Sequence, residues 1–305
     1  FNRWGQSFAT DGAAGQGPHY VFPGSAFRSA VGAHRVLDGL IRGKPNNTGG
    51  EFVAGRHLPE HWQGSFLGND FRANRTVRYE LKESGSGYSA REVETVLHSS
   101  HRSFRPVDIK MGPRGAIYVV DWYNAIIDHG EVDFYHPLRD KSHGRIWRIT
   151  AKNRPLVPAP DIAGSSHEEL LDLLKSPEPY TRNQVKRELI QRPFDPLWPT
   201  VARWLDKLDR ADPRFEQHRL EALWVLMRNR IFESPLLDEI LRSPSAQARA
   251  AAARAVAYAG GEALVAGEEI LSRLGRAAND EHPQVRLEAV NGLRGIGSLE
   301  AANLA

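Results

Sequence analysis

The 305-residue sequence contains no cysteine, which excludes disulfide bonds, thiolate metal centres and covalently attached haem c within this chain. It also has no basic tract. The net charge is only +3, and Lys and Arg are interleaved with Asp and Glu, so no nucleic-acid partner is indicated. The most apolar stretch, from Ala250 to Gly267, is interrupted by Arg254 and Glu262, and no segment therefore reads as a membrane span.

The composition changes near residue 155. Most of the 27 glycines and most aromatic residues precede this point, whereas Ala, Leu, Arg and Glu dominate after it. The first part is therefore predicted to consist of strands and turns, and the second of helices. We expect a β domain over residues 1–154 and a helical domain over residues 166–305. A proline-rich linker over residues 155–165 should separate them, because proline interrupts both ladders and helices.

A Gly turn, an apolar strand and an Asp recur in the first part, ending at Asp11, Asp70 and Asp121. The best-formed unit, Val107–Asp121, predicts a β-hairpin around a Gly-Pro-x-Gly turn. A period of about 50 residues with short strands is typical of β-propeller blades. About three blades fit into this part, and propellers close into rings of about 4–8 blades. We therefore expect a partial β-propeller, with further blades upstream of Phe1.

The second part repeats as pairs of helical segments. A capping box at Ser166–Glu169 opens the first helix. The expected pairs are 170–175 with 179–192 (ended by Pro193), 197–208 with 215–229, 236–242 with 246–259, and 263–278 with 283–296. Each second helix carries an Arg before a small or branched residue, and these are expected to form a ladder between repeats: Arg182, Arg219, Arg249 and Arg286. This pattern predicts a HEAT-like α-solenoid, truncated after a new helix begins at Ser298–Glu300.

Several segments occur in an order that resembles one known family. They are Gly68–Arg72, Phe104–Asp108, Val120–Asn124, His143–Ile149 and Arg219–Trp224. Together they are similar to the membrane-bound dehydrogenase-like family of planctomycetes and verrucomicrobia. The resemblance covers nearly the whole chain. It implies a glucose/sorbosone-dehydrogenase-like propeller joined to HEAT-like repeats, with a cytochrome c module at the C-terminus of the family's members.

This resemblance implies a function as well as a fold. It implies an exported redox protein of the periplasm or cell envelope, which oxidises a small carbohydrate or alcohol and passes electrons to haem c. The haem module would lie outside this chain, because the sequence has no Cys-x-x-Cys-His. Related soluble sugar dehydrogenases use pyrroloquinoline quinone and Ca²⁺, but their quinone-binding residues cannot be matched one by one with positions here.

The repeated aspartates are candidate metal ligands. Equivalent positions lie on one face of a propeller, so Asp11, Asp70 and Asp121, together with Asn124, could gather near one mouth of its channel. Carboxylate and amide oxygens are the ligands that Ca²⁺ prefers. The alternative is that each Asp caps the end of its own strand by accepting hydrogen bonds from turn N–H groups.

The segment between Trp122 and His143 is a long, polar interruption, and loops of this length are usually functional. Asp121 and Asn124 lie where it leaves its sheet, and His143 and Arg145 lie where it returns. Since neighbouring strands are about 5 Å apart, we expect these four side chains to lie together. They offer oxygen ligands, a titratable base and a fixed positive charge. The alternative is a salt-bridged cluster that only pins the loop.

Arg105 precedes the best-formed hairpin and is the third catalytic candidate, as a cation for an anionic or hydroxylic substrate. The alternative is a solvated loop in which Arg105 pairs with a nearby Asp.

Two functions follow from the sequence. One is a sugar or alcohol dehydrogenase whose electrons pass to haem c outside this chain. The other is a non-catalytic propeller and HEAT scaffold that binds proteins or glycans, with the HEAT surface as a docking face.

Overall fold

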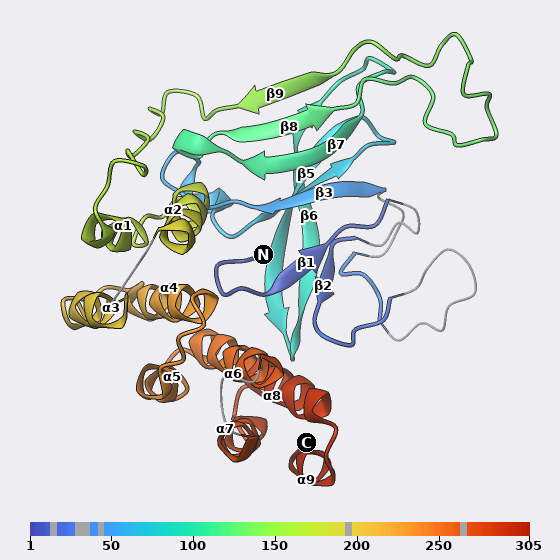
Figure 1. The fold of residues 1–305 in the computed structure, drawn as a ribbon. Helices are drawn as coiled ribbons and strands as arrows, with labels where there is room; N and C mark the ends of the chain where they lie inside the picture. The colour runs from blue at the N-terminus through green and yellow to red at the C-terminus, as the bar shows by residue number, and fades with distance from the viewer. Residues whose placement is uncertain (13–16, 28–36, 42–45, 193–196, 263–266) are drawn as a thin grey trace.

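The computed structural model describes residues 1–12, 17–27, 37–41, 46–192, 197–262 and 267–305. Strands occupy the first half and helices the second, as the composition predicts (Figure 1). The strands are β1 (Ser7–Ala9), β2 (His19–Val21), β3 (Asn47–Phe52), β4 (Phe66–Asp70), β5 (Arg75–Ser84), β6 (Gly87–His98), β7 (Pro106–Met111), β8 (Ile117–Asp121) and β9 (Arg145–Ile149). The helices are α1 (His167–Leu173), α2 (Pro179–Gln191), α3 (Leu197–Asp206), α4 (Phe215–Arg228), α5 (Ser234–Ile240), α6 (Ala246–Gly261), α7 (Gly267–Ala278), α8 (Pro283–Ile296) and α9 (Leu299–Leu304).

The strands form three antiparallel sheets among the described residues. Their orders are β1-β2, β3-β4-β5-β6 and β7-β8-β9. The predicted hairpin over Val107–Asp121 is confirmed, because β7 and β8 pair across a turn in which Arg114 and Gly115 have positive φ. The sheets do not close into a ring within the part of the chain that the structure describes.

The two larger sheets pack against each other along β3 and β7. Thr48 Oγ1 donates to the carbonyl of Pro106 at 3.0 Å, and Glu51 accepts from the Met111 N–H at 3.2 Å. At Gly49, which has a φ of +60°, a Cβ would lie 2.7 Å from the Cα of Asp108. Only glycine therefore permits this approach. The sheets enclose one apolar cluster: Val53, Leu58, Leu67, Ile109, Met111, Ile117 and Val119.

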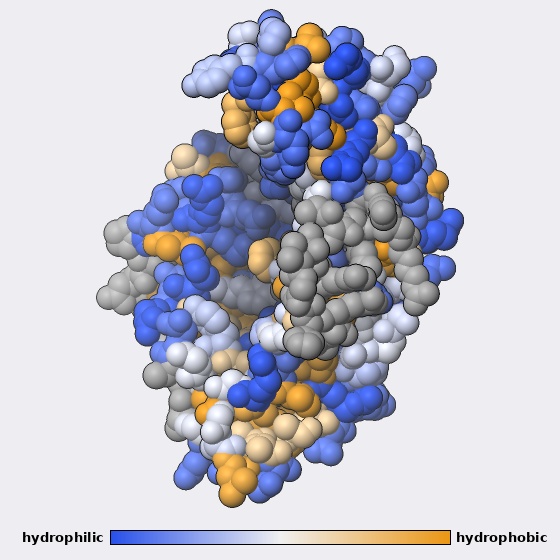
Figure 2. All heavy atoms as spheres, turned by 90° about the vertical axis from the view of Figure 1, so that its right-hand side faces the viewer, coloured by the Kyte–Doolittle hydropathy of each residue, from blue (hydrophilic) through white to orange (hydrophobic). Residues whose placement is uncertain are grey.

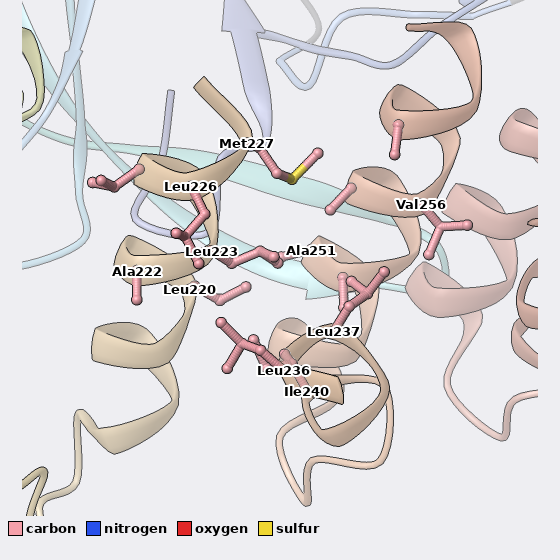
Figure 3. Packing of buried hydrophobic residues seen from close by; sticks show 14 of the residues in the cluster. Leu220, Ala222, Leu223, Leu226, Met227, Leu236, Leu237, Ile240, Ala251 and Val256 are labelled. Atoms are coloured by element: carbon pink, nitrogen blue, oxygen red, sulfur yellow. The ribbon is translucent and has the colours of Figure 1, made fainter. Parts of the chain in front are cut away.

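The helices pack as antiparallel pairs around a second core, rich in Leu and Ala (Figure 3). The predicted capping box is present, with the Ser166 side chain accepting from the Glu169 N–H. The arginine ladder is also present in three of the four positions. Arg182, Arg219 and Arg249 bind Glu221, Glu239 and Asp280 of the following pair at 2.8–2.9 Å, whereas Arg286 binds carbonyls of its own pair. The predicted helix end at Pro193 and helix start at Ala263 lie outside the described residues.

The second helices of the pairs face the strands, and the first helices lie on the outer side (Figure 1). From α4 and α6, Gln217 and Arg254 donate to backbone carbonyls of the N-terminal segment at 2.7 and 2.9 Å. From α8, Gln284 and Glu288 contact Gln6 and Tyr20 at 3.2 and 3.5 Å. The chain's own strands thus cover the inner side of the helical repeats.

The proline-rich segment is also tied to the strands. The Val157 N–H donates to the carbonyl of Arg114, and His57 Nδ1 lies 2.9 Å from the carbonyl oxygen of Pro155. Just beyond it, Glu178 accepts from the backbone and the guanidinium of Arg56 at 2.8–3.0 Å. This segment therefore holds the two regions together. Among the described residues, no helix is both long and apolar enough to cross a bilayer.

Candidate functional site

The predicted site lies at the end of β8, where Asp121 pairs in register with Arg145 of β9. Asp121 is only 1% exposed. Its Oδ1 accepts from the N–H groups of Arg105 (2.8 Å) and Tyr123 (2.9 Å). Its Oδ2 accepts from the Trp147 indole at 3.2 Å and lies 3.8 Å from the Arg145 guanidinium. Both carboxylate oxygens are therefore already used in fixing the strand end.

Arg105 is buried, and it reaches across to the neighbouring sheet rather than into solvent. Its Nε donates to the Asn124 carbonyl at 3.1 Å, and one terminal nitrogen donates to the carbonyls of Phe71 and Arg72 at 3.0 and 3.3 Å. Burial lowers the pKa of Arg105. The predicted role as a substrate-binding cation does not fit these contacts, because Arg105 ties the two sheets together. The solvated alternative does not fit either.

Asn124 fastens the long 122–144 segment. Its Nδ2 donates to the Asp140 carbonyl at 3.1 Å, and its Oδ1 accepts from the Ile126 N–H at 3.2 Å. Further out, Arg139 donates to the carbonyls of Asp128, His129 and Val132 at 2.8–2.9 Å. The segment is thus folded on itself around one guanidinium. It projects from the top of the molecule (Figure 1).

An exposed polar group surrounds Tyr123, and we define it as the Tyr123 cluster: His101, Tyr123, Asp140, His143 and Arg145. The Arg145 guanidinium carbon lies 3.7 Å from the centroid of the Tyr123 ring. The His101 ring stacks on the same ring with 5.5 Å between centroids, and the His143 ring contacts it edge-on at 5.8 Å. His143 Nδ1 lies 2.7 Å from Asp140 Oδ2. The structure therefore brings the predicted His143 and Arg145 together, on the solvent side of Asp121.

The electrostatics of this cluster centre on Asp140. Its Oδ1 accepts from the backbone N–H groups of Ser142 and His143 at 2.9 and 2.8 Å. These two hydrogen bonds, with the His143 ring, lower the pKa of Asp140 to about 2. Asp140 is thus a carboxylate at neutral pH, and its negative charge fixes the orientation of the His143 ring. The His143 side chain stays 64% exposed.

The predicted calcium ligands Asp70, Asp121 and Asn124 are engaged in contacts with the protein itself. Among the described residues, no three His, Asp or Glu side chains gather in a way that could hold a metal ion. Asp70 accepts from the Ala73 N–H and from Arg75, both at 3.4 Å, and Asp121 is saturated as described. Asp11 follows β1, and its neighbour Gly12 lies close to Asn47 and Phe71, near the strand end that holds Asp70. Asn124 uses its amide to hold the loop. Asp70 and Asp121 therefore match the alternative, in which each Asp caps its own strand.

The sequence analysis predicted site residues at the two ends of this segment but did not include Tyr123 or Trp147 among them. Tyr123 has a positive φ of 52°, which is unusual for an aromatic residue and turns its ring toward Arg145 and His143. Trp147 supplies the indole N–H that Asp121 accepts. A register argument could have found Trp147, since it lies two residues after the partner of Asp121.

Comparisons with known protein families support the prediction of HEAT repeats in the helical region. Residues 12–153 match a family model described as a domain of unknown function (DUF7133), and residues 233–304 match HEAT repeats. No curated protein and no solved structure matches the chain. Neither family model supports the dehydrogenase resemblance. What stands is a β-rich region followed by a helical region that carries HEAT repeats.

Proposed function

We propose that the Tyr123 cluster binds a small hydroxylated molecule, a sugar or an alcohol, and that His143 removes a proton from its hydroxyl group. The carrying observation is the 2.7 Å contact between His143 Nδ1 and Asp140 Oδ2. A carboxylate at Nδ1 keeps the proton of the neutral imidazole on that nitrogen, which leaves Nε2 as an acceptor. Because the side chain is exposed, Nε2 is open to a substrate hydroxyl.

Arg145 completes this proposal as a fixed positive charge beside the base. Its guanidinium is held over Tyr123, and its side chain is 42% exposed. A cation in this place stabilises the negative charge that develops on a hydroxyl oxygen as its proton leaves. Asp121, at 3.8 Å, fixes Arg145 rather than neutralising it in a tight bidentate pair.

We propose in addition that the two larger sheets are neighbouring blades of a β-propeller. Their matching strand order and the contact between β3 and β7 favour this arrangement. The finer redox function remains a prediction of the family resemblance. It includes electron transfer to pyrroloquinoline quinone or haem c, and export to the periplasm. Proton removal by His143 would be the first step of such an oxidation, and the electrons would pass to an acceptor outside the Tyr123 cluster.

The test compares His143→Gln with His129→Gln in the natural full-length protein. His129 is an exposed histidine of the same segment and serves as the matched control. D-glucose and ethanol would be the substrates, with an artificial dye as electron acceptor. Removal of a general base should lower kcat by about 10²–10⁴-fold and leave KM nearly unchanged. Equal kcat values for His143→Gln and the unchanged protein would refute the assignment.

A non-catalytic scaffold is the second candidate. The observation that favours it is the outer surface of the helical repeats, which the strands leave uncovered (Figure 1). Because the inner side is occupied by the chain's own strands, a protein partner would have to use α1, α3, α5 or α7. Cross-linking followed by mass spectrometry in cells would place cross-links on these helices. A protein without such cross-links, but with His143-dependent turnover, would favour the first proposal.

A further inference from the structure

The two larger sheets share one strand register. In the first, Asp70 pairs with Arg75 and Leu67 pairs with Arg78. In the second, Asp121 pairs with Arg145 and Tyr118 pairs with Arg148. Each sheet thus has an Asp at the end of its second strand (β4 or β8) and two arginines, three residues apart, on its third strand (β5 or β9). By this register, β9 is the equivalent of β5.

In the first sheet, β6 covers the outer edge of β5 with acidic side chains. Arg75 donates to Glu92 at 2.6 Å, and Arg78 donates to Glu94 at 2.6 Å. The Arg78 side chain is only 8% exposed, because it also donates to Ser65 Oγ at 2.9 Å and lies over the Trp62 ring. The fourth strand therefore supplies both the backbone pairing and the negative charges that the two arginines need.

In the second sheet, no fourth strand lies beside β9 among the described residues. Ile146 is 71% and Trp147 42% exposed, and within the described part of the chain no acidic side chain pairs with Arg148. Edge strands are usually blunted by proline or a bulge. β9 contains no proline, and its register with β8 is uninterrupted. It therefore offers a flat strand edge with open backbone groups.

The segment that follows β9 cannot fill this edge. The Ala151 N–H donates to His57 Nε2 at 2.9 Å, and Val157 is hydrogen-bonded to Arg114. The chain is thus led away toward the helices (Figure 1). Figure 2 views the side toward which the 122–144 segment projects, and it shows apolar atoms among hydrophilic ones at that end of the molecule. Phe134 and Leu138 of this segment are among the exposed apolar residues.

We propose that the edge of β9 docks an extended acidic segment of a partner chain, which adds to the sheet as a fourth strand. The segment carries two acidic residues separated by one position, as Glu92 and Glu94 are in β6. Strand addition of this kind gains affinity from main-chain hydrogen bonds and specificity from side chains. One acid faces Arg148, and the other reaches Arg145. Ile146 and Trp147 become covered.

The test uses the chain's own fourth strand as the probe. A labelled peptide with the sequence of residues 87–98 is titrated against the 305-residue chain and followed by fluorescence anisotropy. Arg148→Glu should weaken binding at least tenfold, because it places like charges opposite each other. A second peptide, in which only the position of Glu94 carries Arg, should restore binding to Arg148→Glu, because Arg148 is the equivalent of Arg78 and Arg78 pairs with Glu94. Arg210→Glu is the control, because Arg210 is exposed and lies between α3 and α4, in the helical region.

A further variant tests the backbone pairing itself. Ile146→Pro removes an N–H from the edge strand, so it should abolish binding of both peptides while circular dichroism stays unchanged. The proposal is overturned if the acidic peptide shows no saturable binding, or if it binds Arg148→Glu as well as the unchanged chain. It is also overturned if sedimentation shows a dimer that Ile146→Pro dissociates, because a second copy would then occupy the edge. The readout is peptide binding, and Arg148 lies outside the Tyr123 cluster, so a failed binding test would leave the role proposed for His143 standing.

Discussion

The β3–β6 sheet and the β7–β9 sheet share a register but differ at two places. In the first, β4 and β5 are joined by residues 71–74 and the edge is closed by β6. In the second, residues 122–144 join β8 to β9 and the edge is open. The first sheet also carries the contacts to the helices, through Arg56 and the tip of the β5–β6 hairpin. Two sheets with the same register thus have different roles: the first contacts the helices, and the second carries the exposed polar residues of the Tyr123 cluster.

This difference depends on how each Asp is used. Asp70 makes two long contacts of 3.4 Å, whereas Asp121 accepts three N–H groups at 2.8–3.2 Å and is almost fully buried. A long insertion needs a firmly fixed exit, because its ends cannot be held by a tight turn. Asp121, which makes more and shorter hydrogen bonds than Asp70, therefore lies where the longer segment leaves its sheet.

The largest expected effect is the loss of this anchor. Asp121→Ala should lower the free energy of unfolding by about 3 kcal/mol, since it leaves three buried donors without an acceptor. Asp70→Ala should cost about 1 kcal/mol. Urea unfolding followed by circular dichroism would measure both. Asp121→Asn keeps one oxygen acceptor and should lose less than Asp121→Ala. Equal losses for Asp70→Ala and Asp121→Ala would remove the distinction between the two sheets.

A smaller effect is expected at the attachment of the first sheet. Burial of Glu178 opposes its ionisation, but hydrogen bonds from Arg56 outweigh burial and lower the pKa of Glu178 from 4.5 to about 2. The folded-state pKa lies below the unfolded one. This contribution is therefore complete above pH 4.5 and disappears as the pH falls to about 2. It should amount to about 2 kcal/mol, given that Arg56 is 61% exposed.

Unfolding free energies measured between pH 6 and pH 2.5 would detect this loss. Glu178→Gln should flatten the dependence on pH, whereas Glu60→Gln should leave it intact, because Glu60 is exposed. A Glu178→Gln protein with the same acid sensitivity as the unchanged chain would show that the attachment depends on other groups.

Much of this frame could be predicted from local signals. The aspartates at strand ends, the Gly-Pro-x-Gly turn and the capping box at Ser166 act within one sheet or one helix pair, and the arginine ladder joins neighbouring helix pairs. Such contacts join residues close in sequence or one repeat apart. The repeat period of the sequence is therefore enough to predict these contacts.

The rest depends on contacts between distant segments. Arg105 was expected at a substrate, but its donors go to the carbonyls of Phe71 and Arg72, on a turn of the other sheet. The calcium site was expected because Asp70 and Asp121 are equivalent. In the structure each is engaged at the end of its own strand, Asp70 by the Ala73 N–H and Arg75, and Asp121 by three N–H groups. The contact of Tyr20 with Glu288 joins opposite ends of the chain, and no periodic pattern encodes it.

The smallest effect is expected within the 122–144 segment itself. Arg139 holds this segment by donating to four backbone carbonyls, but it lies at the surface, so Arg139→Ala should cost less than about 1 kcal/mol of global stability. Its effect should be local. Hydrogen exchange should accelerate at the amides of His136 and Arg139, which donate within the segment, and stay unchanged in β8 and in residues 71–74. Lys141→Ala is the control, because the Lys141 ammonium lies over the Tyr135 ring of the same segment and, among the described residues, donates no hydrogen bond to a backbone carbonyl. If Arg139→Ala left exchange at both amides unchanged, the guanidinium would not be what organises the segment. If it unfolded the whole sheet, the segment would be part of the frame rather than an insertion into it.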